Sequence, residues 1–152
     1  MNWHANQSKY NTMKINIIRY HCKDLCVKGM FYVDGQPMGE TREALPIGYR
    51  YKKRPILPAG LHRCLPCSTD CAAMTLKVCQ KAGHNRLTFG WDALKQQQLG
   101  RILVGQACPT VPPDDRKLER QEETFAQLTQ RIYQAYANQE DFELEVVEQY
   151  GE

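Results

Sequence analysis

The chain has 152 residues and a mass of 17.6 kDa, which fits one domain. Its 42% hydrophobic and 24% charged residues are typical of a globular protein, and its short apolar runs exclude a membrane-spanning helix. A domain of this size buries about two-thirds of its unfolded surface, so folding by itself requires neither a disulfide nor a metal. We place a polar segment at 1–13 and a single domain at 14–152.

The net charge of +3 conceals an uneven distribution. Residues 1–109 carry 16 basic and 6 acidic side chains, whereas residues 110–152 carry 4 basic and 11 acidic ones. This division predicts either a basic face for an anionic partner or an acidic C-terminal segment lying against a basic body. In one small domain, we favour the second arrangement.

The start of the chain and its cysteines indicate the cytoplasm. The first ten residues are polar, and no apolar stretch with a small-residue cleavage site follows them. The seven cysteines are an odd number, which fits reduced thiols better than a complete set of disulfides.

Short segments rich in β-branched and aromatic residues are expected to form strands. The turn dipeptide Asp34-Gly35 predicts a chain reversal after the second of them. The segment 36–58 is rich in proline and glycine, so we expect mostly loop there, with at most a short extended piece around 41–45. The expected strands are 15–20, 27–33, 60–64, 74–79, 86–89 and 101–106.

The C-terminal part changes to a helical period. Two prolines followed by Asp114 and Asp115 are typical of a helix start, and we expect a helix from about 115 to 138. A half-buried strand is expected at 142–147, where apolar residues alternate with glutamates. The fold class is therefore α+β: a mostly antiparallel sheet or small barrel-like sheet, one long C-terminal helix and a final strand. The expected apolar stripe of the helix is Leu118, Phe125, Leu128, Ile132, Tyr133 and Tyr136.

A group of cysteines offers a candidate zinc site. Cys64 and Cys67 form a C-x-x-C pair, and Cys71 and Cys79 follow. Such a pair can bind one zinc ion at about 2.3 Å, with His62, His84, Cys22 or Cys26 as further ligands. No second short-spaced pair lies on a clear turn, so we favour free thiols in or near the core over a zinc-stabilised module.

A basic run interleaves aromatic residues with positive charge. It reads Tyr-Arg-Tyr-Lys-Lys-Arg at 49–54, and its cations are Arg50, Lys52, Lys53 and Arg54. Such a surface can neutralise phosphates and stack on bases. Because the run is short and no helix-turn-helix accompanies it, a solvated loop is the simpler interpretation and a nucleic-acid partner the weaker one.

Three short segments form an ordered series: Thr41-Arg42-Glu43, Leu57-Pro58-Ala59-Gly60, and Leu-Gly-Arg-Ile-Leu-Val-Gly at 99–105. The series resembles a domain family of undetermined function found in phages and in bacteria, some of them gut residents. That family has a Glu after the second strand, an Ile-Pro-Ala-Gly turn, a His-x-Gly-Asn segment and a Gly-Cys-Ile-Leu-Val-Gly motif. The resemblance covers about residues 14–147 and implies a phage or mobile-element origin. A phage protein can reach a virion or leave the host cell without a signal peptide.

The histidine and Gly-Cys of that family are similar to those of the L,D-transpeptidases, which attack a peptide carbonyl with a cysteine thiolate. In this chain Arg101 stands where the family has its thiol. The segment expected to supply the histidine reads Leu-Thr-Phe-Gly-Trp-Asp at 87–92. A guanidinium stays protonated and is not a nucleophile. The resemblance therefore implies a non-catalytic member, a pseudoenzyme.

We therefore expect a domain that binds a protein or an anionic ligand through a basic, loop-rich face. Arg101 is the central candidate, and its alternative role is an ion pair with Glu43 or another acidic residue inside the fold. A second hypothesis is a cell-wall hydrolase or transpeptidase with a relocated Cys108 and His84 pair. The candidate binding residues are Arg101, Arg50, Lys52, Lys53, Arg54, Glu43 and Trp91.

Overall fold

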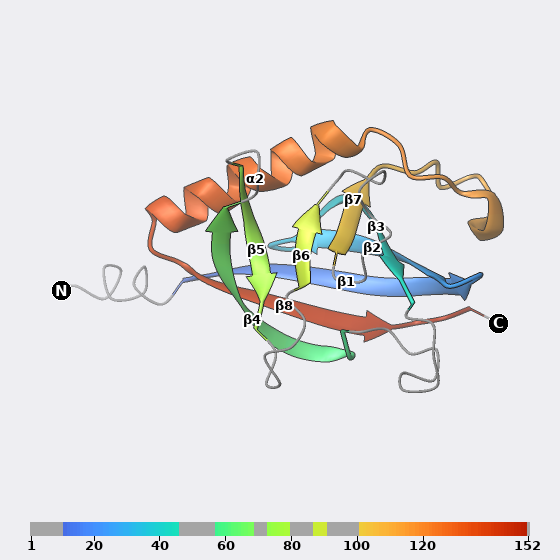
Figure 1. Cartoon of the computed structure of the whole chain (residues 1–152), viewed down its shortest axis with the longest axis horizontal. Coiled ribbons are helices and arrows are strands. Elements are labelled where there is room, and N and C mark those ends of the chain that lie inside the picture. The colour runs from blue at the N-terminus through green and yellow to red at the C-terminus, as the bar shows by residue number, and fades with distance from the viewer. Residues whose placement is uncertain (1–10, 46–56, 69–72, 80–86, 91–100, 152) are drawn as a thin grey trace.

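In the part of the chain that the structure describes, eight strands close into a barrel and an α-helix lies near the C-terminus (Figure 1). The computed structural model describes residues 11–45, 57–68, 73–79, 87–90 and 101–151. The order around the barrel is β1-β2-β3-β7-β6-β5-β4-β8. The elements are β1 (Thr12–Lys23), β2 (Cys26–Val33), β3 (Gln36–Ala44), β4 (Gly60–Ser68), β5 (Met74–Val78), β6 (Leu87–Gly90), β7 (Arg101–Gly105), a 3-10 turn (Pro113–Asp115), α2 (Gln121–Ala137) and β8 (Asp141–Glu148).

The first three strands form a meander with two-residue turns. The turn after β2 is Asp34-Gly35, as predicted, and both residues have positive φ, at 50° and 83°. This backbone matches the twist of the flanking strands. The turn after β1 is Asp24-Leu25, with φ of 54° and 62°. It carries no glycine, and a leucine in this region of φ is strained.

The last strand closes the barrel. β8 lies between β1, to which it is parallel, and β4, to which it is antiparallel. Val146 is opposite both Ile17 of β1 and Gly60 of β4. The C-terminal strand thus joins the two halves of the barrel, and no pairing within the first part of the chain can complete it.

Two expectations about the elements are wrong. Residues 36–44, expected to be mostly loop, form β3, because β2 and β7 pair with it on both sides. The helix begins at Gln121 and not near 115. Glu119 instead exchanges backbone hydrogen bonds of 2.6 and 2.7 Å with Gln106, and Arg120 has a left-handed φ of 52°.

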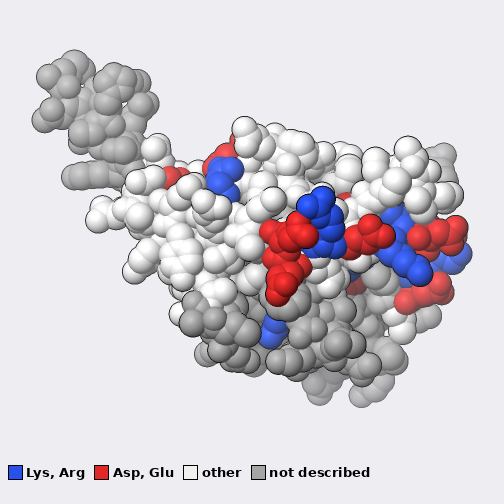
Figure 2. Space-filling model, turned by 90° about the horizontal axis from the view of Figure 1, so that it is seen from above, with Lys and Arg blue, Asp and Glu red and all other residues white. Residues whose placement is uncertain are grey.

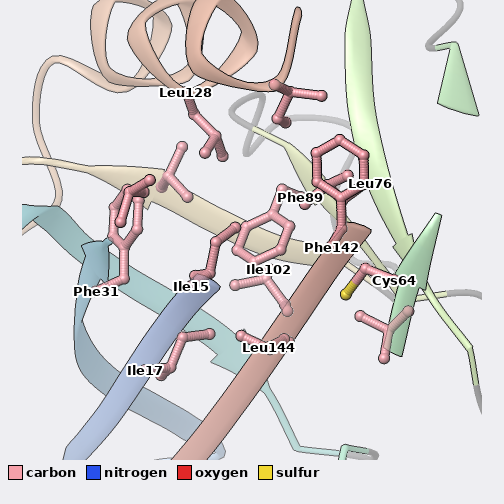
Figure 3. Close-up of a cluster of buried hydrophobic side chains, with 14 of the residues drawn as sticks. Ile15, Ile17, Phe31, Cys64, Leu76, Phe89, Ile102, Leu128, Phe142 and Leu144 are labelled. Atoms are coloured by element: carbon pink, nitrogen blue, oxygen red, sulfur yellow. The ribbon is translucent and has the colours of Figure 1, made fainter. Parts of the chain in front are cut away.

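The barrel interior is filled by buried apolar side chains from all the strands except β3, which adds only the partly buried Met38 (Figure 3). Helix α2 covers it with Phe125, Leu128, Ile132 and Ala135, which recur at intervals of three and four residues. The two tyrosines of the expected stripe, Tyr133 and Tyr136, are exposed instead. Tyr133 is one residue past Ile132, so the helix turns it away from the barrel.

Ion pairs link the acidic C-terminal part to the basic body, as the charge division favoured. Lys14 pairs with Glu145 at 3.1 Å, and Lys23 pairs with Asp114 at 2.8 Å. Figure 2, seen from above, shows acidic and basic side chains next to one another at several places on the described part of this face. No helix in the described part of the chain is long and apolar enough to cross a membrane.

Candidate functional site

A buried arginine organises one end of the barrel. Arg19 continues the inward alternation of Ile15 and Ile17 on β1 and is completely buried. Its Nη2 and Nε lie 2.8 and 3.0 Å from the carboxylate oxygens of Glu43. Nη2 also donates to the carbonyl oxygen of Leu57 at 2.8 Å. Burial alone would lower the pKa of Arg19, but the interactions with Glu43, together with smaller contributions from Tyr150 and Glu148, more than offset it. The pKa is therefore raised, and the side chain stays charged.

The three motifs of the family resemblance meet at this end. Glu43 and Leu57 both contact Arg19, and Glu43 is opposite Ile102 of β7 in the strand register. His62, just after the second motif, lies 2.7 Å from the carbonyl oxygen of Pro58. The three motifs, which are far apart in the sequence, therefore lie close together at the end of the barrel that holds Arg19.

A small pocket of about 130 Å³ opens beside Glu43. Arg101, at the start of β7, is half-buried at this pocket and packs over Gly90 of β6. A Cβ atom at Gly90 would lie 2.9 Å from Nη1 of Arg101 and 3.0 Å from its Cδ, so only a glycine leaves room for this side chain. The lining residues are Leu25, Cys26, Arg42, Glu43, Ala44, Arg101 and Leu103.

The other charges at the pocket already have partners. Glu43 is held by Arg19, and Nη1 of Arg42 lies 2.9 Å from Glu40. Nη2 of Arg42 donates to the carbonyl oxygen of Arg116 at 3.0 Å. The alternative in which Arg101 pairs with Glu43 is not what the structure has. Arg101 forms no ion pair with any described residue.

A network around Glu40 fixes Arg42 in place. The hydroxyl of Tyr20 donates to Glu40, and the guanidinium of Arg116 lies over the Tyr20 ring, 5.2 Å from its centre. Burial, and next the hydrogen bond to Glu40, raise the pKa of Tyr20. Arg19, Tyr20, Glu40 and Arg116 were not among the residues predicted for the site. Only Arg19 could have been found from the sequence, because it lies two residues after Ile17 and four after Ile15 in a predicted strand, where the same face holds apolar side chains.

The cysteine pair of the zinc hypothesis lies on a strand and not on a turn. Because alternate residues of a strand face opposite sides, Cys64 and Cys67 on β4 cannot approach one ion together. Cys64 points into the core (Figure 3), and burial raises its pKa to about 12. Cys79 is exposed beyond β5. Within the described ranges, no three or more Cys, His, Asp or Glu side chains gather as a metal site would require.

Several predicted residues lie outside the described part of the chain. They are Cys71, His84, Trp91 and the basic run with Arg50, Lys52, Lys53 and Arg54. Cys108 is described and exposed, and the hydroxyl of Thr110, 3.0 Å from its sulfur, lowers its pKa. Its predicted partner His84 is not among the described residues.

Comparisons with known proteins bear on the origin of the chain. No protein-family model matches this sequence, and no curated protein or solved structure is significantly similar to it. The likeness to the phage and bacterial family therefore stays a prediction based on its short motifs, and the candidate site rests on the geometry of Arg101 and its pocket.

Proposed function

We propose that this chain is a non-catalytic binding domain that recognises an anionic group of its partner at the Arg101 pocket. One observation carries the proposal: Arg101 is a half-buried cation with no ion-pair partner among the described residues, while Glu43 and Arg42 beside it are already paired. An unpaired, partly desolvated guanidinium is costly unless an anion reaches it.

The chemistry of the pocket favours a carboxylate or a phosphate. A guanidinium presents parallel N–H donors that match two oxygens of either group. Leu25 and Leu103 supply apolar walls beside the charge, so water competes less for the ion than on an open surface. A hydrogen bond to a charged group contributes about 1.5–3 kcal/mol, or roughly 10- to 100-fold in affinity.

The protonation state of the one described cysteine at this pocket is consistent with binding and not with catalysis. Cys26 lines it, and burial raises the pKa of Cys26, so the side chain is mostly the unreactive thiol at neutral pH. Arg101 itself does not act as a nucleophile. The pocket thus offers a cation that can bind an anion, and it has no nucleophile beside that cation.

Titration of 15N-labelled protein with sodium acetate, and separately with inorganic phosphate, tests the proposal by NMR. We expect saturable shifts of the backbone amides of Gly90, Leu103 and Ala44. Arg101→Ala weakens the affinity about tenfold or more, and Arg101→Lys has a smaller effect because it keeps the charge and loses the fork. Arg63→Ala, at an exposed arginine on the outer face of β4, is the matched control and leaves the shifts unchanged.

Two results would overturn the proposal. One is the absence of any saturable shift at these amides with both anions. The other is an Arg101→Ala variant that is folded, by its thermal midpoint, and binds as well as the unchanged chain. The relative affinities for acetate and phosphate separate a carboxylate partner from a phosphorylated one.

A further inference from the structure

Exposed apolar side chains lie along β4 and at the C-terminal end of α2. Leu61 and Leu65 lie at alternate outward positions of β4 and are 61% and 46% exposed. Tyr136, near the end of α2, is 57% exposed. In Figure 1 this end of α2 lies beside β4. Large apolar residues grouped on a surface mark sites of interaction.

These residues line one long groove. A cavity of about 500 Å³ lies between β4 and the end of α2, and a second of about 460 Å³ lies over the paired strands β4 and β8. The two cavities share Arg63, Asp141 and Phe142, so they form a continuous groove. Each is within the size range of about 300–1,000 Å³ that ligand sites occupy.

The groove carries more acidic than basic side chains, and its carboxylates have no ion-pair partner among the described residues. Glu140, Asp141 and Glu143 line it, and none of the three forms an ion pair with a side chain in the described segments. Further along β8, by contrast, Glu145 pairs with Lys14 and Glu148 with Arg19. Arg63, opposite Glu143 in the register, is the one cation among the described lining residues.

We propose that this groove binds a short segment of a partner protein in which a Lys or Arg is flanked by apolar side chains. The free carboxylates complement the cation, and Leu61, Leu65 and Tyr136 receive the apolar neighbours. The ring of Tyr136 adds an aromatic face that attracts a cation. A small cation alone would leave the apolar part of the groove unused.

The recognition proposed for this groove uses its side chains. β4 pairs with β8 along residues 60–64 and with β5 along residues 64–68, so each half of β4 is paired on one edge in these two ladders. The groove shares no residue with the Arg101 pocket, and this inference is therefore independent of the proposed function.

Fluorescence anisotropy with a labelled seven-residue peptide of alternating leucine and lysine tests the inference. We expect saturable binding that weakens at high salt. A peptide with glutamate in place of lysine, and one with serine in place of leucine, should bind at least tenfold more weakly. If the glutamate or the serine peptide binds as well as the leucine–lysine peptide, the inference is wrong, because binding would then depend on apolar contacts alone or on charge alone.

Matched variants locate the site. Tyr136→Ser and the double variant Glu140→Gln/Glu143→Gln should each weaken binding about tenfold. Tyr133→Ser is the control, because Tyr133 is also an exposed tyrosine of α2 and does not line the groove. Arg63→Ala should tighten binding, because it removes a positive charge that repels the lysines of the peptide. A variant with a damaged fold would not bind more tightly. Equal effects of Tyr136→Ser and Tyr133→Ser, or weaker binding by Arg63→Ala, would overturn the assignment.

Discussion

Glu43 accepts two hydrogen bonds from the guanidinium of Arg19, although β1 and β3, the strands that carry them, are not neighbours in the barrel. Both side chains are buried. The same guanidinium donates to the carbonyl oxygen of Leu57, so one side chain holds two strands and the segment before β4 together. A buried ion pair adds little net stability over an apolar pair, but removal of one partner leaves an unpaired charge in the interior.

Replacement of one partner of this pair should destabilise the barrel strongly. Glu43→Gln and Arg19→Met are each expected to lower the free energy of unfolding by about 3–5 kcal/mol, measured by urea denaturation. The double variant Arg19→Met/Glu43→Leu should cost less than the sum of the single changes, because neither charge is then left alone. Lys14→Met, which removes the exposed pair with Glu145, should cost less than about 1 kcal/mol. Similar costs at Arg19 and Lys14 would contradict this account.

Gly90→Ala should displace Arg101 without unfolding the protein. The added Cβ would meet Nη1 and Cδ of Arg101, which are parts of a flexible side chain and can move. We expect a change of less than about 1 kcal/mol in the free energy of unfolding and a several-fold weaker affinity for acetate in the NMR titration. At Gly39 a Cβ would lie 2.3 Å from the backbone oxygen of Gly105, and its φ is 157°. Gly39→Ala should therefore destabilise, and the reverse ranking of the two variants would refute the assignment.

The cysteines should differ widely in their rate of alkylation. Burial raises the pKa of Cys64 to about 12, whereas the Thr110 hydroxyl lowers the pKa of exposed Cys108. Since the thiolate is the reactive form, iodoacetamide at pH 7 should modify Cys108 first and Cys64 last among the described cysteines, as peptide mass spectrometry would show. Thr110→Val should slow the reaction at Cys108. Rapid labelling of Cys64 in the folded protein would contradict its place in the core.

Asp114 should titrate below its ordinary range. The hydrogen bond from Lys23, with a further contribution from His21, lowers the pKa of Asp114 in the folded chain. Its contribution to stability is therefore fully present above the unfolded value of about 3.9 and is lost as the pH falls through the lower, folded value. NMR titration of the carboxyl carbon measures this pKa. Lys23→Ala should raise it and Lys14→Ala should not, and an unchanged pKa in Lys23→Ala would exclude the pairing.

Much of the secondary structure could be predicted from local pattern. The alternation in 15–20 and 142–147, the turn dipeptide Asp34-Gly35 and the late helix all follow from periods of two or 3.6 residues and from turn chemistry. The prediction failed where pairing overrode composition, as in β3. It failed again before α2, where Glu119 forms a β-bridge with Gln106 and the helix therefore begins only at Gln121.

The site depended on contacts that no local pattern encodes. The sequence by itself determined the strand that carries Arg19 and the unusual cation at Arg101, because strand propensity and residue type are properties of short segments. Only the tertiary structure decided that Glu43 pairs with Arg19, that Arg101 lies over Gly90 with no ion-pair partner in the described part of the chain, and that Tyr136 lines a groove. The residues of the site lie on β1, β3, β6 and β7. Strand β8 closes the barrel and brings together residues that are far apart in the sequence, such as Arg19 and Glu148, which are 129 positions apart.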